Sequence, residues 1–206
     1  MSRGKALCDH TAVARFSAEN ISLTSAASTF EDDMSDTQIS LVKVDAIDIG
    51  DFKKELQDAF SIAVKEEFDN LPDGPIPSDD DLDHSINAKG AVALRIMCDG
   101  RKVGGAVVSI NEQTHRNTLD LFFLKVGEEG RGLGHKAWLA LEHRYPKTVA
   151  WRTHTPYFEK RNIHFYVNKC GFKIIEFFND RHTDPNHPVV SDDPAGSEGF
   201  LFEKVM

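Results

Sequence analysis

The chain has 206 residues, of which 40% are hydrophobic and 28% charged, and its formal net charge is -9. This size and composition are typical of one globular domain with a substantial core. An acidic chain without a basic stripe argues against duplex nucleic acid or an anionic membrane as the main partner, and the sequence has no run of about 18 apolar residues that would span a bilayer. Three widely spaced cysteines, without a CxxC pair, favour a reducing cytoplasm.

The first residues differ in composition from the rest of the chain. Residues 1–38 are rich in Ser, Thr and Ala and show weak periodicity, which predicts a poorly ordered tail, with a loosely packed extra helix as the alternative. One folded domain is expected over 39–206. It begins with a predicted strand at 39–46, followed by an amphipathic helix. The apolar positions of that helix recur every four residues: Phe52, Leu56, Phe60, Val64 and Phe68.

The middle of the chain predicts a short helix and three strands. A break rich in proline and acids precedes the helix at 79–87. The segments AVALRIMC (91–98) and KVGGAVVSI (102–110) are strand-like and are joined by Asp-Gly at 99–100, a dipeptide typical of hairpins. TLDLFFLKV (118–126) is the most apolar strand and is expected at the centre of the sheet.

The last third of the chain alternates helices and strands. The elements are expected, in the order helix, strand, helix, strand, strand, at 132–145, 148–155, 157–169, 173–180 and 199–206. Pro146 stops the first of these helices, and Gly171 stands at the C-terminal cap of the second. Because strands both alternate with helices and follow one another directly, the sheet should be mixed.

Three glycines in five residues, Gly130, Gly132 and Gly134, lie between the strand at 118–126 and the following helix. Glycine lets the backbone approach an anion closely, and the first turn of a helix presents N–H groups without partners. The spacing is neither the dinucleotide fingerprint nor the nucleoside triphosphate loop. These residues alone support an anion cradle and a flexible strand-to-helix corner about equally.

Two segments resemble the GNAT superfamily of acyl-CoA-dependent N-acetyltransferases. EGRGLG (129–134) is similar to the family pattern Q/R-x-x-G-x-G/A, and NIHFYVNKCGF (162–172) is similar to the late helix of the family. The resemblance covers about residues 39–206, including the order of the elements. It implies an α/β (α+β) fold with a mixed, mostly antiparallel central sheet of six or seven strands, about four flanking helices and a splayed strand pair.

The resemblance also implies acetyl-CoA as co-substrate, without a metal. Backbone N–H groups of residues 129–135 would hold the CoA diphosphate, and the edge of the strand at 118–126 would pair with the pantetheine arm at Leu124 and Val126. Asn162 would hydrogen-bond the pantetheine. The implied cofactor-binding residues are Leu124, Val126, Glu129, Gly130, Arg131, Gly132, Gly134, His135 and Asn162.

Two carboxylates depart from the family pattern, which has Gln or Arg where Glu129 stands and often an aromatic residue where Glu128 stands. A carboxylate a few ångströms from a phosphate costs about 1 kcal/mol in a water-like dielectric. Arg131, His135 and Lys136 supply cations or potential cations around the same turn. CoA binding is therefore expected to be weakened rather than abolished.

Acetyl transfer to an amine requires a base for the amine proton, donors for the oxyanion and an acid for the leaving thiolate. The resemblance implies a backbone N–H within 124–126 as the oxyanion donor and Tyr166 as the acid, with Tyr157 as the alternative. Tyr166 stands five residues before Gly171, whereas the family tyrosine commonly stands four before its glycine. A shift of one residue along a helix rotates the side chain by roughly 100° about the helix axis. A local bulge could restore the usual orientation.

The sequence offers several general bases. Glu66 and Glu67 end the first predicted helix, His154 ends a strand and titrates in the right range, and Glu159 precedes the late helix. A water chain without a single base is equally compatible with the sequence. A solvated helix end and a satisfied structural histidine are the competing interpretations of Glu67 and His154.

The histidines of the second half, with an H-x4-H spacing among prolines, do not form a zinc signature, and no metal site is predicted. The acidic segment Asp79–Asp81, together with Asp83, could attract a cationic acceptor, although a solvated loop is the favoured explanation.

The leading interpretation is a cytoplasmic N-acetyltransferase that transfers an acetyl group directly from acetyl-CoA to a primary amine of a small molecule or protein, in a ternary complex. The alternative is a catalytically weak or inactive module of the same fold that senses acyl-CoA or binds a protein. Glu128, Glu129 and the shifted register of Tyr166 are the features that favour this alternative. The acceptor, the acyl chain and the formation of a homodimer stay open.

Overall fold

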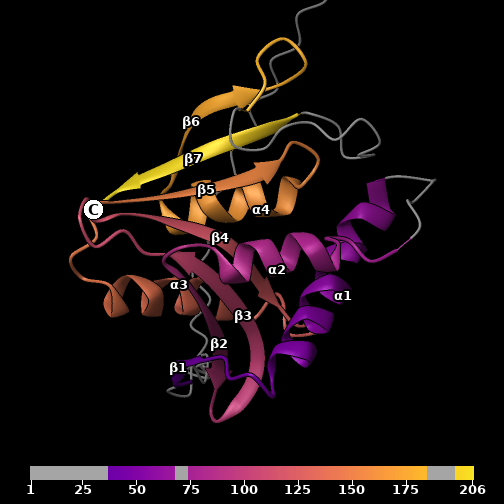
Figure 1. The fold of residues 1–206 in the computed structure, drawn as a ribbon, viewed down its shortest axis with the longest axis vertical. Helices are drawn as coiled ribbons and strands as arrows, with labels where there is room; N and C mark the ends of the chain where they lie inside the picture. Colours follow the sequence, from indigo (N-terminus) through magenta and orange to yellow (C-terminus); the bar gives the residue numbers. More distant parts are fainter. Residues whose placement is uncertain (1–36, 68–73, 185–197) are drawn as a thin grey trace, which may run out of the picture. The chain divides into compact units, whose positions relative to one another are not determined.

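The computed structural model describes residues 37–67, 74–184 and 198–206 (Figure 1). Its elements, in chain order, are β1 (Ile39–Lys43), α1 (Ile49–Glu67), α2 (Asp79–Asn87), β2 (Ala91–Cys98), β3 (Arg101–Ser109), β4 (Arg116–Leu124), α3 (Leu133–Arg144), β5 (Ala150–Pro156), α4 (Lys160–His164), the π-helix η1 (Phe165–Cys170), β6 (Lys173–Phe178) and β7 (Gly199–Val205). The predicted tail, apart from Thr37 and Gln38, lies outside the described residues, as do Phe68 and His187.

The strands form one mixed sheet of seven in the order β1-β2-β3-β4-β5-β7-β6. β4 and β5 are parallel, and the other pairs of described strands are antiparallel. The parallel pairing covers only Arg116–Thr118 against Ala150–Arg152, after which the two strands part. The predicted mixed sheet with a splayed pair and four α-helices is confirmed.

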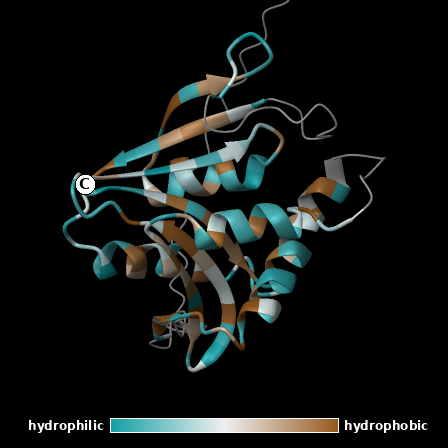
Figure 2. Cartoon of the chain, in the orientation of Figure 1, coloured by the Kyte–Doolittle hydropathy of each residue, from teal (hydrophilic) through white to brown (hydrophobic). Residues whose placement is uncertain are grey.

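The sheet separates two apolar layers because successive side chains of a strand point to opposite faces. On one face, Val107 of β3 packs in a cluster with α1 and α2. On the other face, its neighbour Val108 packs in a cluster with α3 and η1. Figure 2 shows mostly apolar residues along the central strands and mostly polar residues on α2. Between these two layers, β4 and β5 part beyond Thr118 and Arg152 and leave a gap in the sheet.

The helix α1 buries the predicted apolar stripe. Phe52 and Leu56 are fully buried and Val64 is nearly so. The helix can approach the sheet closely because β3 has glycine at position 105, where an added Cβ would lie 2.3 Å from the ring of Phe52. The periodicity of the sequence thus predicted both the helix and the face that it buries.

Two predicted elements need correction. The strand predicted at 118–126 is β4 and ends at Leu124, because the N–H of Glu128 donates to the carbonyl of Lys125 and turns the chain. Val126 therefore lies in the loop and is exposed. The late helix is not a single α-helix, since its second half is the π-helix η1. In contrast, the predicted Asp99-Gly100 hairpin is present, with φ of 49° and 79° at the two residues.

A network of ion pairs lies beneath the start of α1. Arg95 of β2, only 2% exposed, donates to Asp48 at 2.7 Å and also to Glu55 of α1. Lys102 pairs with Asp48 at 2.6 Å, and Lys125, directly after β4, pairs with Glu55 at 2.8 Å. The network thereby connects the start of α1 to two strands, β2 and β3, and to the start of the loop between β4 and α3.

This network predicts an acid-dependent part of the stability. The hydrogen bond from Arg95 is the largest cause that lowers the pKa of the Asp48 carboxyl, from 3.8 to about 2. A lowered folded-state pKa gives stability that is present above the unfolded pKa and is lost as the pH falls through the folded one. The cost of Asp48→Asn in the free energy of unfolding should therefore be constant at neutral pH and shrink between about pH 4 and pH 2. Urea unfolding at several pH values measures this.

Asp51→Asn is the matched control, because Asp51 is exposed on the first turn of α1, three residues after Asp48. A cost of Asp48→Asn that stays constant down to about pH 2 would contradict the stabilising role of its ionised form.

Candidate active site at the splayed strands

The edge of β4 beyond Thr118 faces the gap between β4 and β5. The N–H of Lys125 donates to Val103 of β3 at 2.9 Å. Because backbone groups alternate in direction along a strand, those of Leu124 point away from β3 and toward the gap. The carbonyl of Leu119 accepts the Thr153 hydroxyl of β5 at 2.9 Å, which closes the gap at its narrow end.

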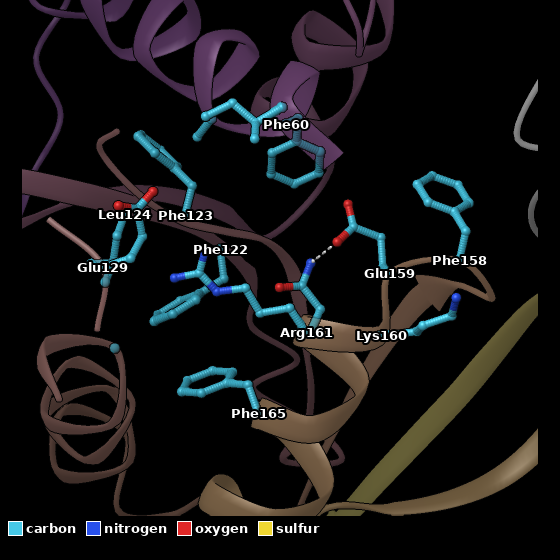
Figure 3. Close-up of a pocket in the computed structure, with 14 residues that line it drawn as sticks. Phe60, Phe122, Phe123, Leu124, Glu129, Phe158, Glu159, Lys160, Arg161 and Phe165 are labelled. Carbon is cyan, nitrogen blue, oxygen red and sulfur yellow. Dashed lines mark hydrogen bonds between the residues drawn. The ribbon is translucent and has the colours of Figure 1, made fainter. Parts of the chain in front are cut away.

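A cavity of about 430 Å³ lies at this gap (Figure 3). It is bounded by α1, by β4, by the glycine turn and by the segment that leads into α4. The residues that line it are Ala59, Phe60, Ile62, Phe122, Phe123, Leu124, Glu129, Gly134, Phe158, Glu159, Lys160, Arg161, Asn162 and Phe165. Leu124, Glu129, Gly134 and Asn162, which the sequence assigned to the cofactor, are thus brought together.

The glycine turn has the open backbone that an anion cradle requires. Gly130 and Gly132 have φ of 80° and 71°, and no described atom lies within 4 Å of a Cβ added at either position. Their conformation rather than a lack of space therefore demands glycine. Gly132 is the N-cap of α3 and no described side chain caps this helix. The N–H groups of its first turn, which includes Gly134 and His135, are the ones that an anion would meet.

The two unexpected carboxylates have partners within the protein. Glu128 pairs with Arg131 at 2.9 Å and with Arg101 at 3.2 Å. Glu129 accepts the N–H of Gly127 at 2.8 Å. Arg131, predicted to bind cofactor, is engaged by Glu128 and by the carbonyl of Gly127. These contacts order the turn, so the carboxylates have a structural role in addition to their charge.

The π-helix accommodates the extra residue before Gly171. The N–H groups of Gly171 and Phe172 both donate to the carbonyl of Tyr166. A π-turn contains one residue more than an α-turn, and Gly171 ends it with a left-handed φ of 80°. The register difference noted in the sequence is therefore matched by a local change of helix type.

Tyr166 lies in the core near the narrow end of the gap. It packs against Phe172 and Phe202, and burial raises the pKa of its phenol, opposed in part by a hydrogen bond with Thr153. Thr153 in turn donates to Leu119 of β4. Tyr166 is not among the residues that line the cavity. Its alternative, Tyr157, is half exposed and lies against Phe200.

Glu159 is a carboxylate that the fold places on the cavity wall. It is only 9% exposed, and its Oε2 accepts the side-chain N–H of Asn162 at 3.0 Å (Figure 3). Asn162 also lines the cavity, so the pair forms a hydrogen-bonded polar patch on its wall, next to Lys160 and Arg161.

The other candidate bases lie elsewhere. The ring of His154 lies tilted beside that of Phe178, with centroids 6.1 Å apart, and against Gly199, and His154 is not among the residues that line the cavity. Glu67 ends α1, but its side chain, like that of Glu66, lies outside the described residues. Of the carboxylates and histidines that the sequence offered as bases, Glu159 is the one seen on the cavity wall.

Three aromatic residues of the wall were missed by the sequence reasoning. Phe60, Phe158 and Phe165 join Phe122 and Phe123, which stand in the strand predicted at 118–126. Phe60 belonged to the predicted apolar stripe of α1, so periodicity marked it as a core residue and carried no sign of a cavity.

Within the described ranges, no three His, Cys, Asp or Glu side chains gather as metal ligands would. His164 contacts Asn168 at 2.9 Å and His182 contacts Glu176 at 2.7 Å. None of the helices in the described part of the chain is both long and apolar enough to cross a membrane.

Comparison with known proteins agrees with this geometry. The family model "Acetyltransferase (GNAT) family" matches residues 53–172. The uncharacterized protein YrkN of Bacillus subtilis (strain 168) is 51% identical over 168 residues, which cover 77% of this chain and 89% of YrkN.

Two solved structures are similar in fold, and each alignment covers 82% of this chain. A Bacillus subtilis acetyltransferase in complex with CoA has a TM-score of 0.57, 15% identity and 99% of its own chain covered. The ribosomal-protein-S18-alanine N-acetyltransferase of Escherichia coli has a TM-score of 0.58, 12% identity and 94% of its own chain covered. The sheet, the splayed pair and the matched family model lead to one conclusion: the chain belongs to the acetyltransferase (GNAT) family.

Proposed function

We propose that the protein is an N-acetyltransferase that transfers an acetyl group from acetyl-CoA to a primary amine, directly and in a ternary complex. The observation that carries the proposal is the cavity at the splayed strands, which has the glycine turn at one end and the buried carboxylate Glu159 on its wall. The CoA complex of the similar Bacillus subtilis acetyltransferase supports CoA as the ligand class. The proposal includes a cytoplasmic location, where acetyl-CoA is present.

The coenzyme would bind along β4. N–H groups of Gly130, Gly132 and the first turn of α3 would hold the diphosphate. The backbone of Leu124, which faces the gap, would pair with the pantetheine arm as an added strand does. Val126 lies beyond the strand, so this role rests with Leu124. Arg161 also lines the cavity, and in Figure 3 its side chain extends across it, where it would meet the anionic ligand.

The reaction would use Glu159 as the base. The carboxylate takes a proton from the ammonium, and the amine nitrogen attacks the thioester carbonyl carbon. A backbone N–H of β4 stabilises the tetrahedral oxyanion. The C–S bond then breaks, and the thiolate takes up a proton, for which the phenol of Tyr166 is the candidate donor. The amine nitrogen loses its second proton as it becomes the amide, and this proton restores the phenol, while Glu159 releases its proton to solvent. The products are the amide and CoA.

Direct transfer is favoured over a covalent cysteine intermediate. Cys98 and Cys170 are both buried, and burial raises the pKa of each thiol. A thiol whose pKa is raised is a poor nucleophile because the thiolate is the reactive form. The described cysteines therefore act as core residues.

An enzyme is favoured over a sensing module without turnover. Three features supported the module: Glu128, Glu129 and the register of Tyr166. Glu128 and Glu129 have partners in the turn, and η1 accommodates the register. None of the three blocks the cavity.

Calorimetric titration with acetyl-CoA tests the cofactor assignment. The wild type should bind, and Glu129→Gln should bind up to about fivefold more tightly, because removal of one nearby negative charge is worth about 1 kcal/mol. Release of CoA with a panel of amines should accompany binding.

Glu112→Gln is the control, because Glu112 is exposed in the loop at the opposite end of β4 and should leave the affinity unchanged. The absence of binding by all three proteins would overturn the assignment of acetyl-CoA. Binding without release of CoA for any amine would instead favour the sensing module.

A further inference from the structure

The cavity has an apolar part that the coenzyme, as proposed above, leaves uncovered. The edge of β4, the glycine turn and Asn162 would contact the coenzyme. The remaining wall comes from α1, from β4 and from the segment after β5. Its members are Ala59, Phe60, Ile62, Phe123, Phe158, Glu159 and Lys160. Five of these seven side chains are apolar, and three of the five are phenylalanines.

Within this part of the described cavity, Glu159 is the one carboxylate, and Lys160 and Arg161 follow it directly on the same wall. Figure 3 shows Phe60 on the side of α1 and Phe158 with Glu159 on the facing wall. An ammonium group has one favourable position here, at Glu159. A second cation on the same acceptor molecule would lie near Lys160 and Arg161, whose positive charges would repel it.

The acidic segment that the sequence offered as an attractant for cations is engaged in local structure. Asp79 accepts the side-chain N–H of Gln57 at 2.9 Å. Asp81 accepts the hydroxyl of Ser78 at 2.6 Å, and Asp83 pairs with Lys53. These contacts hold the start of α2 against α1 and give the three carboxylates a structural role.

We propose that the acceptor is a monoamine with an apolar body, such as an arylalkylamine, rather than a polyamine or a basic peptide. The inference rests on the proposed function, which it makes more specific. The ammonium binds at Glu159, and the apolar body packs between Phe60 and Phe158. Burial of the apolar body against these rings favours such an amine over smaller or more polar amines, because each buried methylene in a fitted pocket is worth about 10-fold or more in kcat/KM.

The test measures initial rates with saturating acetyl-CoA and three amines: 2-phenylethylamine, ethylamine and spermidine. For the wild type, kcat/KM for 2-phenylethylamine should exceed that for ethylamine by about 100-fold or more, and spermidine should be the poorer substrate. Phe60→Ala should reduce this preference by about 10-fold while the affinity for acetyl-CoA is retained. The matched control is Phe177→Ala, a half-exposed phenylalanine on β6 outside the cavity, which should keep the preference.

The wild-type panel decides the inference even if Phe60→Ala fails to fold. Faster turnover of spermidine or ethylamine would overturn the acceptor class and leave the acetyltransferase assignment intact. Calorimetric titration of 2-phenylethylamine into the CoA complex shows whether this amine binds when no turnover is detected. Binding of this amine without any turnover would remove the proposed function and keep the apolar amine site, whereas no binding and no turnover would overturn the acceptor class.

Discussion

Glu159→Gln is expected to lower kcat/KM for acetyl transfer by about 10²–10⁴-fold, the range typical of a lost general base, while acetyl-CoA affinity changes by less than about twofold. Glutamine has the same shape, and its carbonyl oxygen still accepts the N–H of Asn162, which the carboxylate accepts at 3.0 Å. It cannot take the proton from the ammonium. Initial rates and calorimetry on the same preparations measure both quantities.

The pH dependence distinguishes a base from a residue that only positions its neighbours. A free alkylammonium has a pKa of about 10, so the unprotonated amine becomes abundant at high pH without help. If Glu159 removes the proton, the deficit of Glu159→Gln should shrink as the pH rises toward about 10. A deficit that is the same at every pH would indicate a positioning role.

The control is Glu129→Gln, which removes the other carboxylate that lines the cavity. Its turnover should stay within about fivefold of the wild type, since Glu129 bonds the backbone of the turn. Activity of Glu159→Gln within about threefold of the wild type would leave a water chain or Glu67 as the base.

Periodicity and turn chemistry were sufficient to predict most elements. The apolar stripe of α1 and the Asp99-Gly100 hairpin follow from short-range patterns, and both are present. Such signals are reliable because one buried face or one turn conformation determines them locally. The element ends were less accurate, as with β4, whose end depends on the bond between Glu128 and Lys125.

The assembly of the site was harder to predict because it depends on distant segments. Glu128 is paired with Arg101, which is 27 residues earlier in the chain. Glu128 could be compared with a family pattern from the sequence, but the sequence could not show that Arg101 is the partner of Glu128. Similarly, alternation along a strand places His154 on one face, but only the sheet order shows that this face meets Phe178 rather than the cavity.

The choice among candidate bases illustrates the same limit. Glu67 and His154 were the bases favoured from the sequence, with Glu159 as a third possibility, and only the cavity distinguishes Glu159 from His154. The weakening of CoA binding by Glu129 stays a prediction, for which the calorimetric titration is the test. The π-helix was anticipated only as a bulge that would restore the register of Tyr166, and its extent over Phe165–Cys170 came from the structure.

Arg95→Met should lower the free energy of unfolding by about 3–5 kcal/mol, the usual cost of breaking a buried ion pair by removal of one partner. Arg95 is 2% exposed, donates to Asp48 and Glu55, and lies over the ring of Phe52 at 5.0 Å. Methionine fills much of the same space but leaves two carboxylates with only the exposed ends of Lys102 and Lys125 as partners. Urea unfolding at pH 7 measures the loss.

The cost arises from the unpaired carboxylates rather than from the lost arginine itself, and this can be tested by removing them as well. The triple variant Asp48→Asn, Glu55→Gln, Arg95→Met should be more stable than Arg95→Met alone, because replacement of a whole buried network by neutral groups is often nearly neutral. Additive losses in the triple variant would contradict this account. Lys125 leads into the glycine turn and is held by Glu55. The triple variant should therefore bind acetyl-CoA more weakly even where its stability recovers. Such a result would separate the stabilising role of the network from its role in positioning the turn.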